Sequence, residues 1–120
     1  MFERSAGILL HITSLPGRFG LGDLGTEAME FLDFLAAARQ RWWQMLPLNP
    51  PGYGNSPYQC WSAFAGNPLL ISPDSLLADG LLHESDFAEL PTGESGDRVD
   101  FGLAFSVRPH LIGLAFSRFD

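Results

Sequence analysis

The chain has 120 residues, a hydrophobic fraction of 46% and a formal net charge of −7. This length allows one domain at most, and the hydrophobic fraction indicates a packed core rather than a disordered chain. All seven basic residues are arginines and they form no run, which disfavours binding to nucleic acid or to an anionic membrane. The scattered acidic residues are typical of a solvated surface.

The single cysteine, Cys60, excludes an intrachain disulfide and fits a reducing compartment. It has no basic neighbour and no paired histidine, so thiol catalysis is disfavoured. The sequence shows no metal-binding cluster, no signal-peptide pattern and no apolar run near the roughly 18 residues that span a bilayer. We therefore expect a soluble, cytoplasmic chain without a metal.

The first predicted element is a strand at residues 6–11, where a nearly continuous apolar run is typical of a strand buried on both faces of a sheet. A helix capped by Thr26 should follow, with acidic residues in its first turn. Apolar residues recur along it at helical spacing, at Ala28, Phe31, Leu32, Leu35 and Ala38. Residues 42–48 predict a second strand, which Pro47 places at an end or edge. Together these elements predict a βαβ unit with parallel strands.

Loops rich in glycine and proline follow both predicted strands, at residues 13–25 and 49–68. Function collects at the carboxyl ends of the strands in such units, so we expect the two loops to open on the same face. The second loop is expected to have a defined, rigid conformation that is neither a helix nor a central strand, because proline removes backbone donors and glycine allows positive φ angles. It displays Tyr53, Tyr58 and Trp61, and aromatic faces held by stiff backbone suit a flat, weakly polar ligand such as a sugar ring.

The pattern is looser downstream. Residues 73–82 predict one or two helical turns that stop near Gly80, and residues 103–119 predict an amphipathic helix in which Pro109 causes a kink or a late start. A lone βαβ unit leaves two sheet edges exposed and one face uncovered, so the chain looks like the opening of a larger domain.

Five segments occur along the chain in a distinctive order, namely GILLHITSLPG, GLGDLG, QRWWQMLPL, GYGNSPYQCWSAFAGNPLLI and VDFG. Together they resemble the amino-terminal part of the 4-α-glucanotransferases, also called amylomaltases or disproportionating enzymes, of the α-amylase clan. The resemblance runs from about residue 5 to residue 102 and continues more weakly through the last predicted helix. Each segment alone is weak evidence, whereas five in sequence with compatible spacing are specific.

The resemblance implies an α/β fold in which residues 1–120 form the N-terminal part of one (β/α)₈ barrel catalytic domain, without a second domain. It implies an enzyme that cleaves an α-1,4-glucan and passes the segment to the 4-hydroxyl of an acceptor glucan or glucose. Its partners are α-1,4-glucans and maltooligosaccharides, and it uses no metal or organic cofactor. The family's retaining chemistry depends on carboxylates. These lie on downstream strands, and neither Asp23 nor Asp100 matches one, so the chain alone is expected to be inactive.

The same resemblance indicates substrate-binding residues. Tyr58 matches a tyrosine that stacks on the sugar beside the cleavage point, Ser56 matches a serine of the same loop, and Tyr53 matches an aromatic used at an outer glucan site in some members. The sequence departs from the family pattern at four positions. Ile12 stands where proline is usual, Arg39 where glycine is usual, Asn55 where aspartate is usual and Cys60 where serine is usual.

Each of these residues also has a structural interpretation. Tyr58 could be a core aromatic, and Ser56, which precedes a proline, could stabilise a turn. Trp61 and Phe64 are expected to pack beneath the loop, and His11 is expected to bond backbone as a structural histidine. Two other functions stay open, a non-catalytic glucan-binding or decayed fragment and an α-glucan hydrolase of the same clan.

Overall fold

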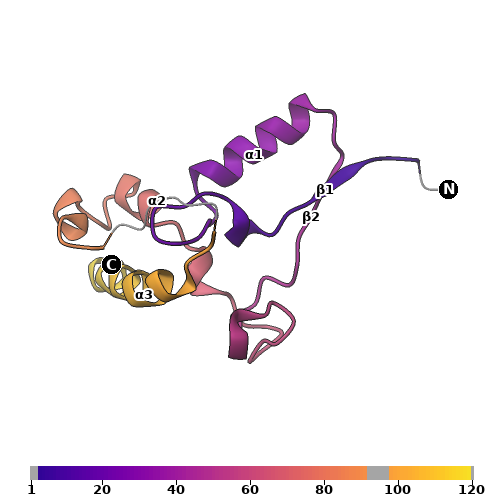
Figure 1. The fold of residues 1–120 in the computed structure, drawn as a ribbon. Coiled ribbons are helices and arrows are strands. Elements are labelled where there is room, and N and C mark those ends of the chain that lie inside the picture. The colour runs from indigo at the N-terminus through magenta and orange to yellow at the C-terminus, as the bar shows by residue number, and fades with distance from the viewer. Residues whose placement is uncertain (1–2, 92–97, 120) are drawn as a thin grey trace.

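The predicted βαβ unit is present in the computed structural model, which describes residues 3–91 and 98–119. Strands β1 (Gly7–Leu9) and β2 (Trp42–Gln44) are parallel, and helix α1 (Thr26–Ala37) connects them (Figure 1). Gly7 lies opposite Trp42 and Leu9 opposite Gln44. The prediction of two parallel strands joined by a helix is therefore confirmed.

Both strands are shorter than predicted, and the first is more exposed than predicted. After β1 the chain turns into a 3-10 helix at Ile12–Ser14, and after β2 it reaches Pro47, which has no N–H to donate. The expectation that the first strand is buried on both faces is wrong for the described residues, where Gly7 and Leu9 are exposed. The physical reason is that this sheet has only two strands among the described residues, which leaves both strands at an edge; α1 contacts it through the edge-on packing of Phe31 on Trp43, at 4.9 Å between ring centroids.

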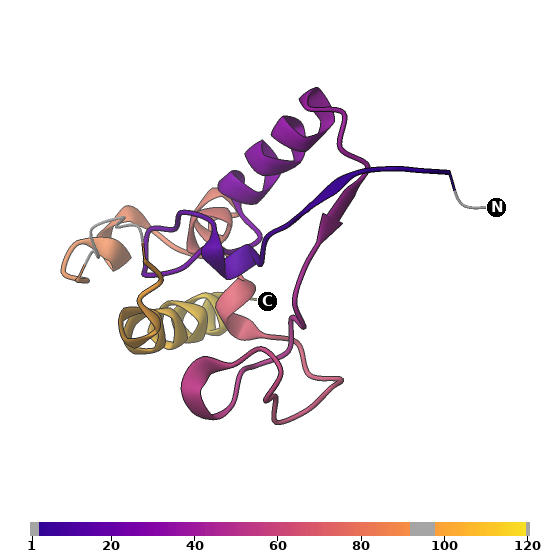
Figure 2. The same ribbon diagram turned by 45° about the vertical axis from the view of Figure 1, so that its right-hand side comes forward.

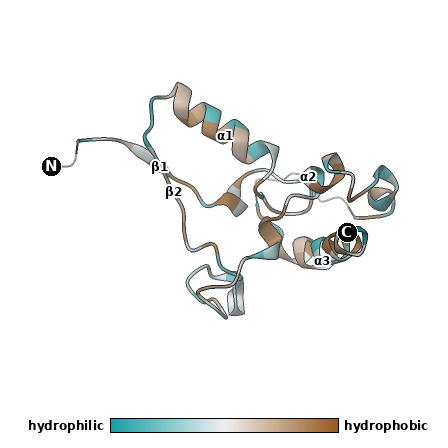
Figure 3. Cartoon of the chain, turned by 180° about the vertical axis from the view of Figure 1, so that it is seen from behind, coloured by the Kyte–Doolittle hydropathy of each residue, from teal (hydrophilic) through white to brown (hydrophobic). Residues whose placement is uncertain are grey.

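Helix α1 is capped by Gly25 and not by Thr26, which is its first helical residue, so the predicted cap is wrong. The Gly25 position is crowded, since a Cβ there would lie 2.5 Å from Ser72 Oγ. The predicted apolar stripe is only partly covered: Ala28 and Leu35 are buried and Phe31 is half-buried, whereas Leu32 and Ala38 are exposed. Hydrophobic and hydrophilic segments alternate along this helix in Figure 3.

The carboxyl end of α1 is closed by a Schellman motif. The Gln40 N–H donates to Leu35 O at 2.9 Å, and the Arg39 N–H donates to Ala36 O at 3.0 Å. This motif requires a left-handed residue after the helix, and Arg39 has a φ of +55°. An arginine therefore occupies a position that glycine adopts without steric cost.

We expect Arg39→Gly to raise the free energy of unfolding by about 1 kcal/mol, because it relieves the left-handed strain of a residue with a Cβ. Urea unfolding of the two proteins measures the difference. Ala38→Gly is the matched control, since Ala38 has a φ of −79° and glycine there should be destabilising. A loss of stability in Arg39→Gly would show that the φ angle is not strained.

The second half of the chain is helical and contains the core. Helix α2 (Pro73–Ala78) ends before Gly80, as predicted, and α3 (Phe101–Arg118) starts two residues earlier than predicted. Pro109 lies inside α3 and does not delay its start. Pro109 has no backbone N–H to donate, and the packing of the buried inner face of α3 offsets the loss of that hydrogen bond. Its buried hydrophobic residues are Ala104, Val107, Leu111 and Ala115.

The main hydrophobic cluster lies between α3 and the loops rather than against the sheet. It consists of Phe19, Leu82, Phe87, Val107, Leu111 and Ala115. The loop at residues 49–68 projects on the opposite side of the strands from α1, as Figure 2 shows. Among the described residues, no helix is long and apolar enough to cross a membrane.

Candidate functional site

The loops that follow β1 and β2 meet at the carboxyl ends of the strands. A cavity of about 200 Å³ lies between them. Its walls come from both loops and include His11, Thr13, Asn49, Asn55, Pro57 and Asn67. The expectation that the two loops open on the same face is confirmed.

The loop at residues 49–68 is tied to itself by hydrogen bonds near both ends. Asn49 Nδ2 donates to Ala63 O at 2.9 Å and to Ala65 O at 3.1 Å. Closer to the tip, Pro51 and Cys60 form an antiparallel bridge, and the Gly52 N–H donates across it. These bonds close the loop on itself, and the regular structure within it is limited to this bridge and a 3-10 helix at Tyr53–Asn55.

Positive φ angles turn the chain at the tip of this loop, where Gly54 has a φ of +71° and Asn55 a φ of +56°. Asparagine tolerates the left-handed region better than most residues, so the departure from the family's usual aspartate at Asn55 keeps the turn.

The aromatic side chains of the loop face solvent in the described chain. Tyr58 is 71% exposed and Tyr53 is 90% exposed, so Tyr58 is not a core aromatic here. Trp61 and Phe64 are 84% and 99% exposed. The expectation that these two pack beneath the loop is wrong for the described residues, because no other described element lies close enough to cover them.

Ser56 lies in the turn immediately before Pro57 and Tyr58. Its Oγ accepts a hydrogen bond from the Tyr58 backbone N–H at 3.3 Å. The predicted turn-stabilising role is therefore present. The bond also ties the backbone of Tyr58 to the turn.

His11 stands at the junction of β1 and the first loop and lines the cavity. Its Nδ1 is buried and has no hydrogen-bond partner among the described residues, so this nitrogen does not make the backbone bond that we expected. Burial lowers the pKa of His11, which favours the neutral imidazole. A neutral imidazole donates one hydrogen bond from its protonated nitrogen and accepts one at the other nitrogen.

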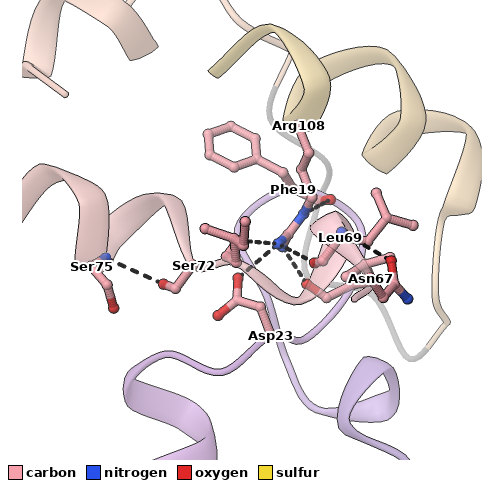
Figure 4. A network of polar contacts seen from close by, with 9 residues as sticks. Phe19, Asp23, Asn67, Leu69, Ser72, Ser75 and Arg108 are labelled. Carbon is pink, nitrogen blue, oxygen red and sulfur yellow. Dashed lines mark hydrogen bonds and ion pairs between the residues drawn. The ribbon is translucent and has the colours of Figure 1, made fainter. Parts of the chain in front are cut away.

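A buried ion pair joins α3 to the first loop, and neither partner was a candidate site residue from the sequence. Arg108 of α3 is fully buried, and its Nη1 donates to Asp23 Oδ2 at 2.9 Å (Figure 4). Burial raises the pKa of Asp23, while the charge and hydrogen bond of Arg108 oppose this rise. The sequence does contain a signal for Arg108, which lies on the same helical face as Ala104, Leu111 and Ala115.

Comparison with known proteins gives a consistent family. A sequence model described as 4-alpha-glucanotransferase matches residues 10–120. The 4-alpha-glucanotransferase of Synechocystis sp. is 50% identical over 117 residues, which are 98% of this chain and 23% of that protein. The 4-alpha-glucanotransferase of Thermus thermophilus is 49% identical over 116 residues, which are 97% of this chain and 22% of that protein.

A solved structure is similar as well. The amylomaltase from Streptococcus agalactiae in complex with acarbose superposes with a TM-score of 0.89 at 41% sequence identity. The match covers 98% of this chain and 24% of that one. The chain thus spans about a quarter of the length of these relatives.

Proposed function

The chain belongs to the 4-alpha-glucanotransferase family, and from this membership we propose that it forms the N-terminal, sugar-binding part of an enzyme that transfers segments of α-1,4-glucans. The acceptor is the 4-hydroxyl of another glucan or of glucose. The substrates are α-1,4-glucans and maltooligosaccharides, and the protein works in the cytoplasm without a metal or organic cofactor.

The fold that we propose for the whole protein is a (β/α)₈ barrel, with residues 1–120 inside its catalytic domain. The parallel β1–α1–β2 unit supports this, because it is the repeating unit of such barrels. The position of both loops at the carboxyl ends of the strands supports it as well, since that is the face on which barrel enzymes build their active sites.

One observation carries the binding role, namely that Tyr58 is exposed on a tied-down loop at the edge of the cavity. Its neighbours Asn55 and Pro57 line that cavity. A tyrosine held in this way offers a rigid apolar face at low entropic cost, which is what stacking on a sugar ring needs. We assign Tyr58 to stacking on the sugar beside the cleavage point and Tyr53 to an outer glucan site. Ser56, in the same loop as Tyr58, is assigned to substrate binding as well.

The chemistry itself belongs to carboxylates in the remaining part of the protein. In retaining glycoside chemistry, a nucleophile and an acid/base stand about 5 Å apart across the scissile bond. The role of this chain is then to hold the glucan so that the scissile bond lies between those groups. Orientation of this kind supplies a large part of enzymatic rate enhancement.

The test is the product pattern of the full-length protein, read from the coding sequence beyond Asp120, on maltotriose. Transfer predicts glucose together with maltooligosaccharides longer than maltotriose. Glucose and maltose without longer products would instead identify an α-glucan hydrolase. Binding of acarbose without any conversion of maltotriose, or a stop codon directly after Asp120, would favour the non-catalytic glucan-binding fragment.

A further inference from the structure

Arg108 connects α3 to the first loop, residues 13–25, and to residues 69–71, which directly follow the second loop. Besides Asp23, its guanidinium donates to Leu21 O at 2.7 Å and to Leu69 O at 2.9 Å. Longer contacts reach Ile71 O at 3.3 Å and Phe19 O at 3.5 Å. Figure 4 shows Phe19, Asp23 and Leu69 gathered around the guanidinium. One buried side chain therefore joins the loop after β1 to the segment that directly follows the loop after β2.

In the first loop, the carbonyl that accepts from Arg108 is one residue away from a hydrogen bond to the cavity wall. Leu21 O accepts from Arg108, and the next residue, Gly22, donates its N–H to Thr13 O at 3.2 Å. Thr13 lines the cavity. Gly22 fits there because it has no side chain, since a Cβ would lie 2.4 Å from Ile12 O. The first loop is thus closely packed against the start of its own chain at Gly22.

On the other side, Leu69 O accepts from Arg108, and the Leu69 N–H donates to Asn67 Oδ1 at 3.0 Å. Asn67 lines the cavity and is the last residue of the loop before Pro68. The Leu24 N–H also donates to Leu70 O at 3.0 Å, which joins the same two segments a second time. The guanidinium therefore sits where the two walls of the cavity are joined.

We infer that Arg108 is a positioning residue for glucan binding, which sets the spacing between the two loops and hence the place of Tyr58 relative to the first loop. This inference rests on the proposed function for its ligand. Arginine suits the task because its planar group has five N–H donors in a fixed fork and can serve several acceptors at once. Lysine keeps the charge beside Asp23 but cannot reproduce that fork.

The test compares Arg108→Lys with Arg118→Lys in the full-length protein. Arg118 is a matched control, since it also extends from α3 to a carboxylate and a carbonyl, donating to Asp86 Oδ1 at 3.0 Å and to Leu81 O at 3.1 Å. Neither Asp86 nor Leu81 lines the cavity. If Arg108 only stabilised the fold, both variants would lower the unfolding midpoint and leave the binding constants of the folded protein unchanged.

We expect Arg108→Lys to raise the acarbose dissociation constant and the KM for maltooligosaccharides about tenfold, with a smaller change in kcat. Amide hydrogen exchange should become faster in both residues 13–25 and residues 49–71, whereas Arg118→Lys should change neither quantity. Unchanged exchange in the two loops of Arg108→Lys would overturn the inference.

Two further arms keep the result decisive. If Arg108→Lys does not fold, the isosteric Asp23→Asn weakens the same junction and should show the same increase in exchange and in KM. If the wild-type protein does not bind acarbose, the proposed function fails. The exchange measurement still decides whether Arg108 sets the spacing between the two loops.

Discussion

Replacing Asp23 with alanine should lower the free energy of unfolding by about 3 to 5 kcal/mol, the usual cost of removing one partner of a buried ion pair. Arg108 is fully buried, and its Nη1 lies 2.9 Å from Asp23 Oδ2. Without the carboxylate, the guanidinium keeps its backbone acceptors but has no counter-charge in a low-dielectric interior. Urea unfolding at neutral pH measures the loss.

An exposed ion pair in the same chain provides the control. Arg18 Nη1 lies 3.1 Å from Asp74 Oδ1, and the two side chains are 40% and 44% exposed. Asp74→Ala should therefore cost at most about 1 kcal/mol, because solvent screens such pairs. Equal losses in the two variants would show that burial of the Asp23–Arg108 pair has no special weight for stability.

Replacing Tyr58 with alanine should lower kcat/KM for maltooligosaccharides in the full-length protein by about tenfold to a hundredfold. The loss corresponds to removal of one well-placed aromatic contact, on the order of 1.4 to 2.7 kcal/mol. Because the ring is largely exposed in the described chain, its removal should change the unfolding midpoint little.

Tyr58→Phe is the matched variant for this prediction, since it keeps the ring and removes only the hydroxyl. We expect it to retain most of the wild-type kcat/KM. If phenylalanine loses as much activity as alanine, the hydroxyl rather than the aromatic face carries the contact. Wild-type kinetics in Tyr58→Ala, with the fold intact, would contradict the binding role altogether.

Local patterns were sufficient to predict the framework of the site. The apolar run before His11, the helical stripe and the proline-rich loop each depend on neighbours in sequence, and they place two loops at the carboxyl ends of β1 and β2. The resemblance marked Arg39 as a position where glycine is usual, and the structure shows that the arginine adopts the left-handed conformation there.

Features that depend on distant partners could not be predicted in this way. The acceptors of Arg108 lie 37 to 89 residues away in the sequence, and most of them are backbone carbonyls that no residue type reveals. The exposure of Trp61 and Phe64 depends on which elements surround the loop, which their own sequence context does not state. The carbonyl acceptors and this exposure thus became clear only from the fold.

The central claim is that the loop at residues 49–68 holds a glucan through Tyr58. A structure of the full-length protein with bound acarbose tests it most directly. The proposal predicts a sugar ring stacked on the face of Tyr58, with carbon atoms within about 4 to 4.5 Å of the ring, beside the cavity between the two loops. Well-ordered acarbose at the catalytic carboxylates without contact to Tyr58 would contradict it.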